Sequence, residues 1–324
     1  MNTGSVAQRL ADTPGVARTI LGAARAARGM PGADPRAMSH SWLFTGPPGS
    51  GRSLAAIDFA AALMCTDPEE PGCGRCEACR AVLETKQHTD LVLVDPQEVI
   101  IPVDTVREVI GRAASLPTVA SWRVVIFNNA DRLNNNGANA LLKTVEEPPA
   151  RTVIIMCAPS DASEDFSQTL RSRCRHLYIP SPSVESITAQ LVSEGASDHD
   201  AHLAALTSLR HVGRARRLVN DPAVQKRRAV AINLAEDVFH GSQGFQAVTS
   251  LLKLVDSEAK ESHKEQEEAE LAKLEQTLGV GAKGKGAAKA QRDARSAIKD
   301  LQDQHKKRAK RRVIDNLDLV LVDL

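Results

Sequence analysis

The chain has 324 residues, enough for two or three domains that each bury a core. Its 41 Lys and Arg against 40 Asp and Glu give a formal charge of +1, which excludes a uniformly basic coat for nucleic acid but allows a local basic patch. With 42% hydrophobic and 25% charged residues, the composition is that of an ordinary globular protein. Neither an apolar run of about 20 residues nor a secretory signal is visible, so we expect no membrane partner. Six cysteines, four of them clustered, suit the reducing cytoplasm better than an extracellular disulfide framework.

The first half of the chain alternates short β-type runs with longer amphipathic stretches. The expected strands are residues 41–45, 91–94, 123–127, 152–157 and 176–179. Strands that alternate with helices usually pair in parallel, because each crossover helix covers a face of the sheet. The pattern therefore predicts an α/β domain with a mainly parallel sheet and helices on both faces.

A glycine-rich segment, GPPGSGRS at residues 46–53, lies between an expected strand and an expected helix. It matches the phosphate-loop pattern G-x-x-x-x-G-K-[ST], in which backbone N–H groups surround the phosphates, except that Arg52 stands in place of lysine. A planar guanidinium does not replace a compact ammonium at the β- and γ-phosphates. We therefore predict a phosphate loop by ancestry and leave open whether it still binds ATP or ADP. The candidate nucleotide-binding residues in it are Gly46, Gly49, Gly51, Arg52 and Ser53.

The strand at residues 123–127 ends in two amides, Asn128 and Asn129. ATPases with a phosphate loop carry an aspartate that holds Mg²⁺ here, and often a glutamate that orients water. An amide has no charge for a divalent cation and cannot act as a general base at neutral pH. Asp131 lies further along and is expected to be a helix cap or a surface charge. The sequence therefore predicts that the hydrolytic site lacks the acidic side chains that hold Mg²⁺ and activate water.

Four cysteines lie within fifteen residues, in two C-x₂-C steps preceded by a longer spacing. Such a set can close a tetrahedral site around one structural Zn²⁺, whereas a catalytic zinc keeps one position open. The predicted ligands are Cys65, Cys73, Cys76 and Cys79. Cys157 and Cys174 lie in apolar surroundings and are expected to be inert.

After the strands, the pattern becomes helical. Residues 184–195 form one amphipathic stretch, and residues 202–220 are expected to form two helices around a turn at Gly213. A third region begins near Pro222 and runs to the end of the chain.

The third region holds two segments of opposite charge. Residues 258–275 have seven Glu against three Lys, and residues 283–312 have twelve Lys and Arg against three Asp, with a flexible break at residues 279–286 between them. An antiparallel helical hairpin over residues 256–312 would place the acidic arm beside the basic one. A solvated helix or disordered spacer, or an arm that touches DNA, remain the alternatives.

Residues 139–149 (NALLKTVEEPP) are expected to be a helix ended by a double proline, and residues 170–174 (LRSRC) a loop that displays Arg171 and Arg173. A surface arginine is most often merely solvated. An arginine finger supplied in trans, however, accelerates hydrolysis at a neighbour's phosphate loop by large factors.

Four sequence motifs follow one another along the chain: SWLFTGPPGSGRS, CGRCEAC, NNADRLNNNGANALLKTVEEPP and TLRSRCR. Together they closely resemble the bacterial clamp-loader subunits of DNA polymerase III, which belong to the AAA+ family. The resemblance is strong over residues 38–220 and weak beyond. It implies an AAA+ (RecA-like) P-loop domain over residues 1–180 with an inserted zinc module at 65–79, a helical lid domain over 181–221, and an all-α collar domain over 222–324. Since a typical collar is longer and the chain ends within an apolar helical pattern, a partial collar is expected.

The resemblance also implies roles for single residues. Arg173 matches the arginine finger that such subunits insert into a neighbour's ATP site, Arg214 falls at the second sensor arginine of the lid, and the four cysteines match the family's zinc module. Members that hydrolyse ATP carry a sensor threonine where this chain has Ala158. The implied protein is a stator without ATPase activity of its own, a component of the polymerase (nucleotidyltransferase) assembly. Its implied partners are the gamma/tau and delta subunits of a hetero-oligomeric, pentameric clamp loader, and through that complex the sliding clamp and primer-template DNA.

Two other functions stay open at this point. A working gamma/tau-like ATPase would need Arg52 and a displaced acid such as Asp131 or Glu146 in place of the usual groups. An independent DNA-binding protein would use the basic residues 283–312.

Overall fold

A computed structural model describes residues 4–96, 98–237, 242–261, 263–277 and 287–323. Its internal contacts divide the chain into two compact units, one built from residues up to 216 and the other from residues 217 onward together with residues 98 and 99. Within these described ranges, no helix is both long and apolar enough to cross a membrane.

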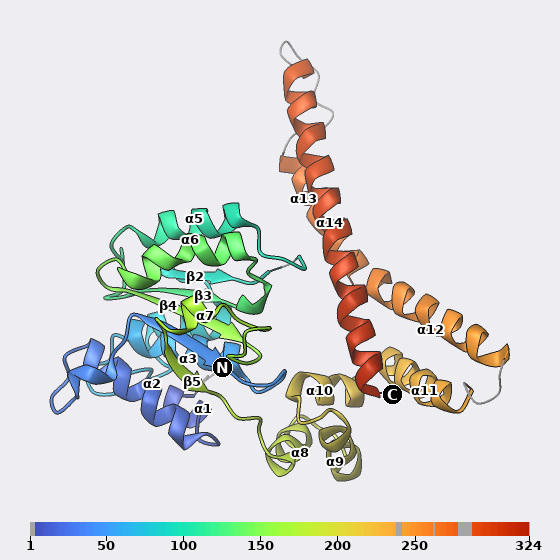
Figure 1. The fold of residues 1–324 in the computed structure, drawn as a ribbon, viewed down its shortest axis with the longest axis horizontal. Helices are drawn as coiled ribbons and strands as arrows, with labels where there is room; N and C mark the ends of the chain where they lie inside the picture. Colours follow the sequence, from blue (N-terminus) through green and yellow to red (C-terminus); the bar gives the residue numbers. More distant parts are fainter. Residues whose placement is uncertain (1–3, 97, 238–241, 262, 278–286, 324) are drawn as a thin grey trace. The chain divides into compact units, whose positions relative to one another are not determined.

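The first unit is built on a five-stranded parallel sheet in the order β2-β3-β4-β1-β5 (Figure 1). All five expected strands are confirmed to within one residue at either end. Their bounds are β1 Ser41–Thr45, β2 Leu91–Val94, β3 Arg123–Phe127, β4 Thr152–Ala158 and β5 Arg175–Tyr178. Because β1 pairs with both β4 and β5, the loop that follows it leaves from the interior of the sheet's carboxyl edge, where α/β sheets commonly bind ligands.

Helices cover both faces of this sheet (Figure 1). Trp42 and Phe44 pack into one buried cluster with α1, α2 and α3, whereas Leu43 between them packs into a second cluster with α5, α6 and α7. This alternation follows from the two-residue period of a strand, and explains why the central strands are mainly apolar on both faces. The helix bounds are α1 Val6–Arg9, α2 Pro14–Ala27, α3 Arg52–Met64, α4 Glu77–Arg80, α5 Val103–Ala113, α6 Asn135–Glu146 and α7 Gln168–Arg171.

Three helices follow the sheet: α8 Val184–Ser193, α9 Asp198–Thr207 and α10 Val212–Asn220. The expected turn at Gly213 is wrong, because α10 begins at Val212 and Gly213 lies in its first turn. The break comes earlier, where Leu209 and Arg210 adopt positive φ values of 53° and 61°. The backbone N–H of Arg214 then donates to Nδ1 of His211, so a histidine side chain, and not a glycine, marks the start of α10.

The second unit is all helical. Its bounds are α11 Pro222–Asp237, α12 Ser242–Glu261, α13 Lys264–Thr277 and α14 Ala287–Asp323. Side chains from α11, α12 and α14 form a small buried cluster that includes Leu234, Leu251 and Val320. Within the expected hairpin region, α13 runs antiparallel to α14 (Figure 1), and Glu267 pairs with Arg312 at 2.7 Å. The expected break at residues 279–286 lies outside the described residues.

Candidate functional site

The glycine-rich segment forms a tight loop between β1 and α3. Gly49 and Gly51 have φ values of 85° and 86°, which side chains rarely allow. The N–H of Ser50 donates to the carbonyl of Pro47, and the N–H of Gly46 donates to the carbonyl of Pro159 after β4. The loop thus has the strand-loop-helix setting of a phosphate loop, with α3 starting at Arg52.

Arg52 turns back onto this loop. Its guanidinium Nη1 donates a short hydrogen bond to the carbonyl of Gly46, the first residue of the loop. Burial lowers the pKa of Arg52, while the nearby Cys157 and Asp131 act in the opposite direction. The side chain that stands in place of the phosphate-binding lysine is therefore partly buried and bound to the loop itself.

His211 lies against the outer turn of the loop. A Cβ atom placed on Gly49 would come within 2.4 Å of His211 Cγ and 2.6 Å of its Cα, so only glycine fits there. Arg214, one helical turn further along α10, is 5% exposed. The residue that contacts the glycine-rich loop is therefore His211, three residues before the expected sensor arginine. The sequence did not indicate this role for His211. Its proximity to Arg214 in the chain was the only available signal.

The carboxyl end of β3 carries amides, as expected. Asn129 has a φ of 52°, and the Oδ1 atom of Asn128 is buried with no hydrogen-bond partner in the described part of the chain. Asp131 is not a helix cap, because Asn134 caps α6, and it is not a freely solvated charge. Burial raises its pKa, and Arg52, close enough to act on it electrostatically, opposes that rise. Asp131 therefore belongs to the electrostatic surroundings of Arg52.

The expected arginine loop follows α7. Arg171 pairs with Asp161 at 2.6 Å. Arg173 donates from Nε to a carboxylate oxygen of Glu146 at 2.5 Å and from Nη1 to the carbonyl of Thr169 at 2.8 Å, and its side chain is 36% exposed. Glu146 is the last residue of α6, just before the double proline. The arginine loop at residues 170–174 therefore meets the end of the helix that the double proline terminates. Arg173 is thus accessible at the surface and is bound by one carboxylate and one carbonyl.

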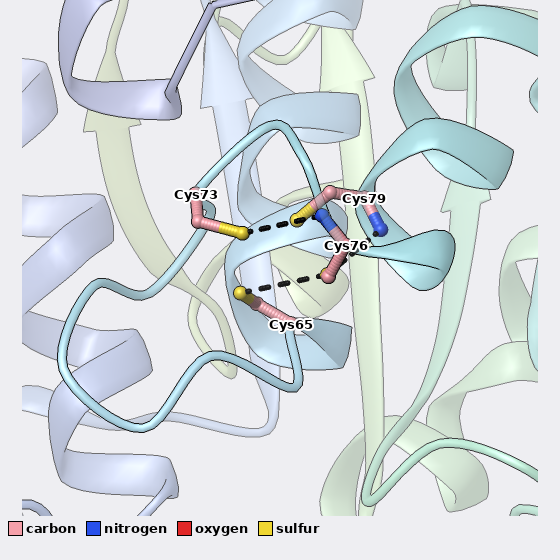
Figure 2. Close-up of side chains that lie close together, drawn as sticks. All are labelled: Cys65, Cys73, Cys76 and Cys79. Carbon is pink, nitrogen blue, oxygen red and sulfur yellow. Dashed lines mark hydrogen bonds between the residues drawn. The ribbon is translucent and has the colours of Figure 1, made fainter.

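The four clustered cysteines converge on one point (Figure 2). Their sulfur atoms all lie within 4.8 Å of one another, and those of Cys65 and Cys76 are 3.9 Å apart. A tetrahedral set of four Zn–S bonds of about 2.3 Å would place the sulfurs about 3.8 Å apart. A hydrogen bond from Cys79 lowers the pKa of Cys65 to about 4, so one sulfur is readily available as a thiolate, the form that binds metals. The four residues could hold a metal ion.

The segment that carries these cysteines, residues 65–79, which we term the knuckle, is bound to helix α1. The N–H of Val6 donates to the carbonyl of Gly72 at 2.8 Å, and a Cβ atom on Gly72 would come within 2.4 Å of the Val6 side chain. Burial raises the pKa of the two remaining cysteines, Cys157 and Cys174, to about 12, so both are thiols at neutral pH.

Comparison with known proteins gives a consistent relationship. Residues 33–183 match the family model described as DNA polymerase III, delta subunit. The chain is 35% identical over 147 residues to DNA polymerase III subunit delta-prime of Pseudomonas aeruginosa, which covers 44% of this chain and 44% of that protein. It is 33% identical over 170 residues to the subunit delta-prime of Escherichia coli, covering 52% of this chain and 50% of that protein.

A gamma/tau subunit of DNA polymerase III from Mycobacterium tuberculosis is also similar, at 32% identity over 174 residues, covering 52% of this chain and 30% of that protein. The matches to the two delta-prime subunits span about half the length of those relatives. The resemblance seen in the motifs is confirmed: residues 33–183 match the model of the DNA polymerase III delta subunit family, and delta-prime subunits are among the similar proteins.

Proposed function

We propose that the chain is a delta-prime subunit of the DNA polymerase III clamp loader, a stator that hydrolyses no ATP and supplies Arg173 in trans to ATP bound by a gamma/tau neighbour. The observation that carries the proposal is a contrast within one domain. Arg173 is accessible at the surface, whereas the chain's own phosphate loop is contacted by Arg52 and His211, and strand β3 ends in amides instead of acids.

The chemistry of the two halves of this contrast is complementary. A guanidinium near a γ-phosphate stabilises the charge that develops on the transferred phosphoryl group. Arg173 can exchange its bond to Glu146 for a bond to phosphate, because a surface ion pair contributes only about 0 to 1 kcal/mol. At the end of β3, Asn128 and Asn129 supply neither a charged ligand for Mg²⁺ nor a base for water.

Within this proposal the remaining regions have supporting roles. Residues 181–221 form the lid domain and residues 222–324 part of the collar through which the pentamer assembles with gamma/tau and delta subunits. The four cysteines hold a structural Zn²⁺, which would crosslink the knuckle to α3 and α4 without entering the reaction. The sliding clamp and primer-template DNA are reached through the complex.

The gamma/tau-like alternative draws support from the similarity to gamma/tau subunits. It requires an acid beside the loop, and Asp131 is the side chain that the structure offers. Burial raises the pKa of Asp131, and Arg52 is already bound to the carbonyl of Gly46. For these two reasons we favour the stator.

The deciding experiment is reconstitution with gamma/tau subunits, delta and the sliding clamp. Arg173→Ala is expected to leave assembly intact on gel filtration and to lower ATP hydrolysis and clamp loading by at least about 10-fold. Arg171→Ala, which removes the neighbouring arginine and its pair with Asp161, is the matched control and is expected to keep the wild-type rates. Equal rates for Arg173→Ala and wild type would reject the role of Arg173, and metal-dependent phosphate release by the chain alone would reject the stator.

A further inference from the structure

The charged hairpin is not used by the proposed function, and its two faces differ. One face of α14 packs against α13 through ion pairs: Arg312 contacts Glu267 at 2.7 Å, and Arg308 and His305 contact Glu270 at 2.8 and 3.1 Å. The exposed fractions of these side chains lie between 12% and 32%. This seam accounts for the pairing of the two arms, and it uses only part of the basic charge of α14.

The other face of α14 carries a row of exposed cations, which we term the basic stripe: Arg295, Lys299, Lys306 and Lys310. At 100° per residue these positions fall within about 60° of one another, and their centre lies about 140° from the centre of the seam. The stripe is about 22 Å long at 1.5 Å per residue. Lys306 contacts Asp303 at 3.0 Å, on the edge of the stripe. The stripe therefore points away from α13 and contributes nothing to the seam.

Cations four residues apart on one helical face repel one another, and Asp303, which pairs with Lys306 and lies close enough to Lys299 to act on it electrostatically, offsets only part of this repulsion. A polyanion removes this repulsion. A DNA duplex presents one negative charge per about 1.7 Å of its axis, so a straight row of about 22 Å meets phosphates along its whole length. Each neutralised phosphate releases condensed counterions, which drives binding even without any apolar contact.

A second copy of the chain is the competing occupant, because α13 exposes Glu265, Glu268 and Glu275 on its outer side. Such a contact would consist of surface ion pairs, which gain little. The exposed positions of the stripe include no apolar side chain that could add buried area. Charge complementarity without apolar area is the combination that suits a nucleic-acid backbone and not a protein interface.

We propose that the basic stripe of α14 binds the phosphate backbone of duplex DNA directly and without sequence preference. The proposal concerns a contact made by this chain itself, and it does not depend on Arg173 or on the assembly of a clamp loader.

The test measures binding of the purified full-length chain to a fluorescein-labelled duplex of about 20 base pairs, by anisotropy, at salt concentrations from about 50 to 200 mM. The stripe variant Lys299→Gln/Lys306→Gln/Lys310→Gln keeps good helix formers and removes three charges. The control variant Lys143→Gln/Lys226→Gln/Lys253→Gln removes three exposed lysines elsewhere, so both variants have the same net charge. Circular dichroism checks that both keep the helical content of the wild type.

For the wild type, we expect the logarithm of the binding constant to fall with the logarithm of salt with a slope of about −3 to −4, one contact per cation of the stripe. The stripe variant should lose about 2 to 3 units of that slope and bind at least about 10-fold more weakly at about 100 mM salt, while the control variant should match the wild type. The proposal is overturned if the wild type does not bind the duplex, or if the control variant loses as much affinity for DNA as the stripe variant. It is also overturned if the stripe variant binds DNA as before and loses only a salt-sensitive self-association, measured by sedimentation.

Discussion

Replacing Asp90 by asparagine is expected to destabilise the first unit strongly at neutral pH and much less in acid. Asp90, just before β2, is fully buried, and its carboxylate accepts the backbone N–H groups of Thr118, Val119 and Ala120 at 2.7, 2.7 and 2.9 Å. It also pairs with the buried Arg123 at 2.9 Å. Burial alone would raise the pKa of Asp90, but these four partners outweigh it and lower the pKa to about 2.

The size of the effect follows from this shift. An aspartate in an unfolded chain has a pKa of about 3.9, so a folded pKa of about 2 corresponds to about 2 to 3 kcal/mol of stability. Because the folded pKa is the lower one, this stability is present above pH 4 and is lost as pH falls from about 4 to about 2. Asp90→Asn also leaves Arg123 buried without a counter-charge, which brings the expected loss at pH 7 to about 3 to 5 kcal/mol.

Urea unfolding followed by tryptophan fluorescence measures this loss, because both tryptophans, Trp42 and Trp122, lie in the first unit. The difference between wild type and Asp90→Asn should shrink by about 1 kcal/mol between pH 7 and pH 3. Asp104→Asn, which removes an 86% exposed carboxylate, should change the free energy of unfolding by less than about 0.5 kcal/mol. Equal urea midpoints for Asp90→Asn and wild type at pH 7, or a difference that does not vary with pH, would refute the reasoning.

Two further predictions concern the candidate site. Cys76→Ser removes one of four sulfur donors, so it should lower the zinc content, measured by elemental analysis, and lower the melting temperature by at least about 5 °C. A wild-type protein that contains no metal and melts at the same temperature as the variant would contradict this. Arg52→Lys restores the lysine of the phosphate-loop pattern but should leave phosphate release at background, because Asn128 supplies no carboxylate and His211 still lies on Gly49; metal-dependent turnover by this variant would show otherwise.

Features encoded by neighbouring residues could be predicted from the sequence. The strand at 123–127 is buried at every position and apolar from Val124 to Phe127, because both faces of the sheet are covered, and it forms β3 without any shift in its bounds. The cysteine knuckle was recognisable because its two C-x₂-C steps place the ligands within a few residues. The hairpin of α13 and α14 followed from two charge runs of opposite sign, although the sequence could not exclude a solvated spacer.

Features that depend on contacts between distant residues could not be predicted. Neither Gly49 nor His211 carries a local signal for the other, yet their contact leaves no room for a side chain at position 49 of the phosphate loop. The pairing of Glu146 with Arg173 likewise depends on how the end of α6 meets the loop after α7. The misplaced turn at Gly213 has the same origin, because glycine is a good general sign of a turn but His211 caps the helix here.

These distant contacts bear on how a stator would work. A ligand shifts a conformational equilibrium only by the difference between its affinities for the two states. In this chain the guanidinium of Arg52, which stands at the phosphate-binding position, already donates to the carbonyl of Gly46, and His211 lies against Gly49, so a nucleotide would have to displace contacts that the chain makes with itself. Under the proposed function, the nucleotide state of this subunit therefore has no effect on Arg173, which is presented in the same way throughout the cycle, and the changes that follow ATP binding and hydrolysis arise in the neighbours.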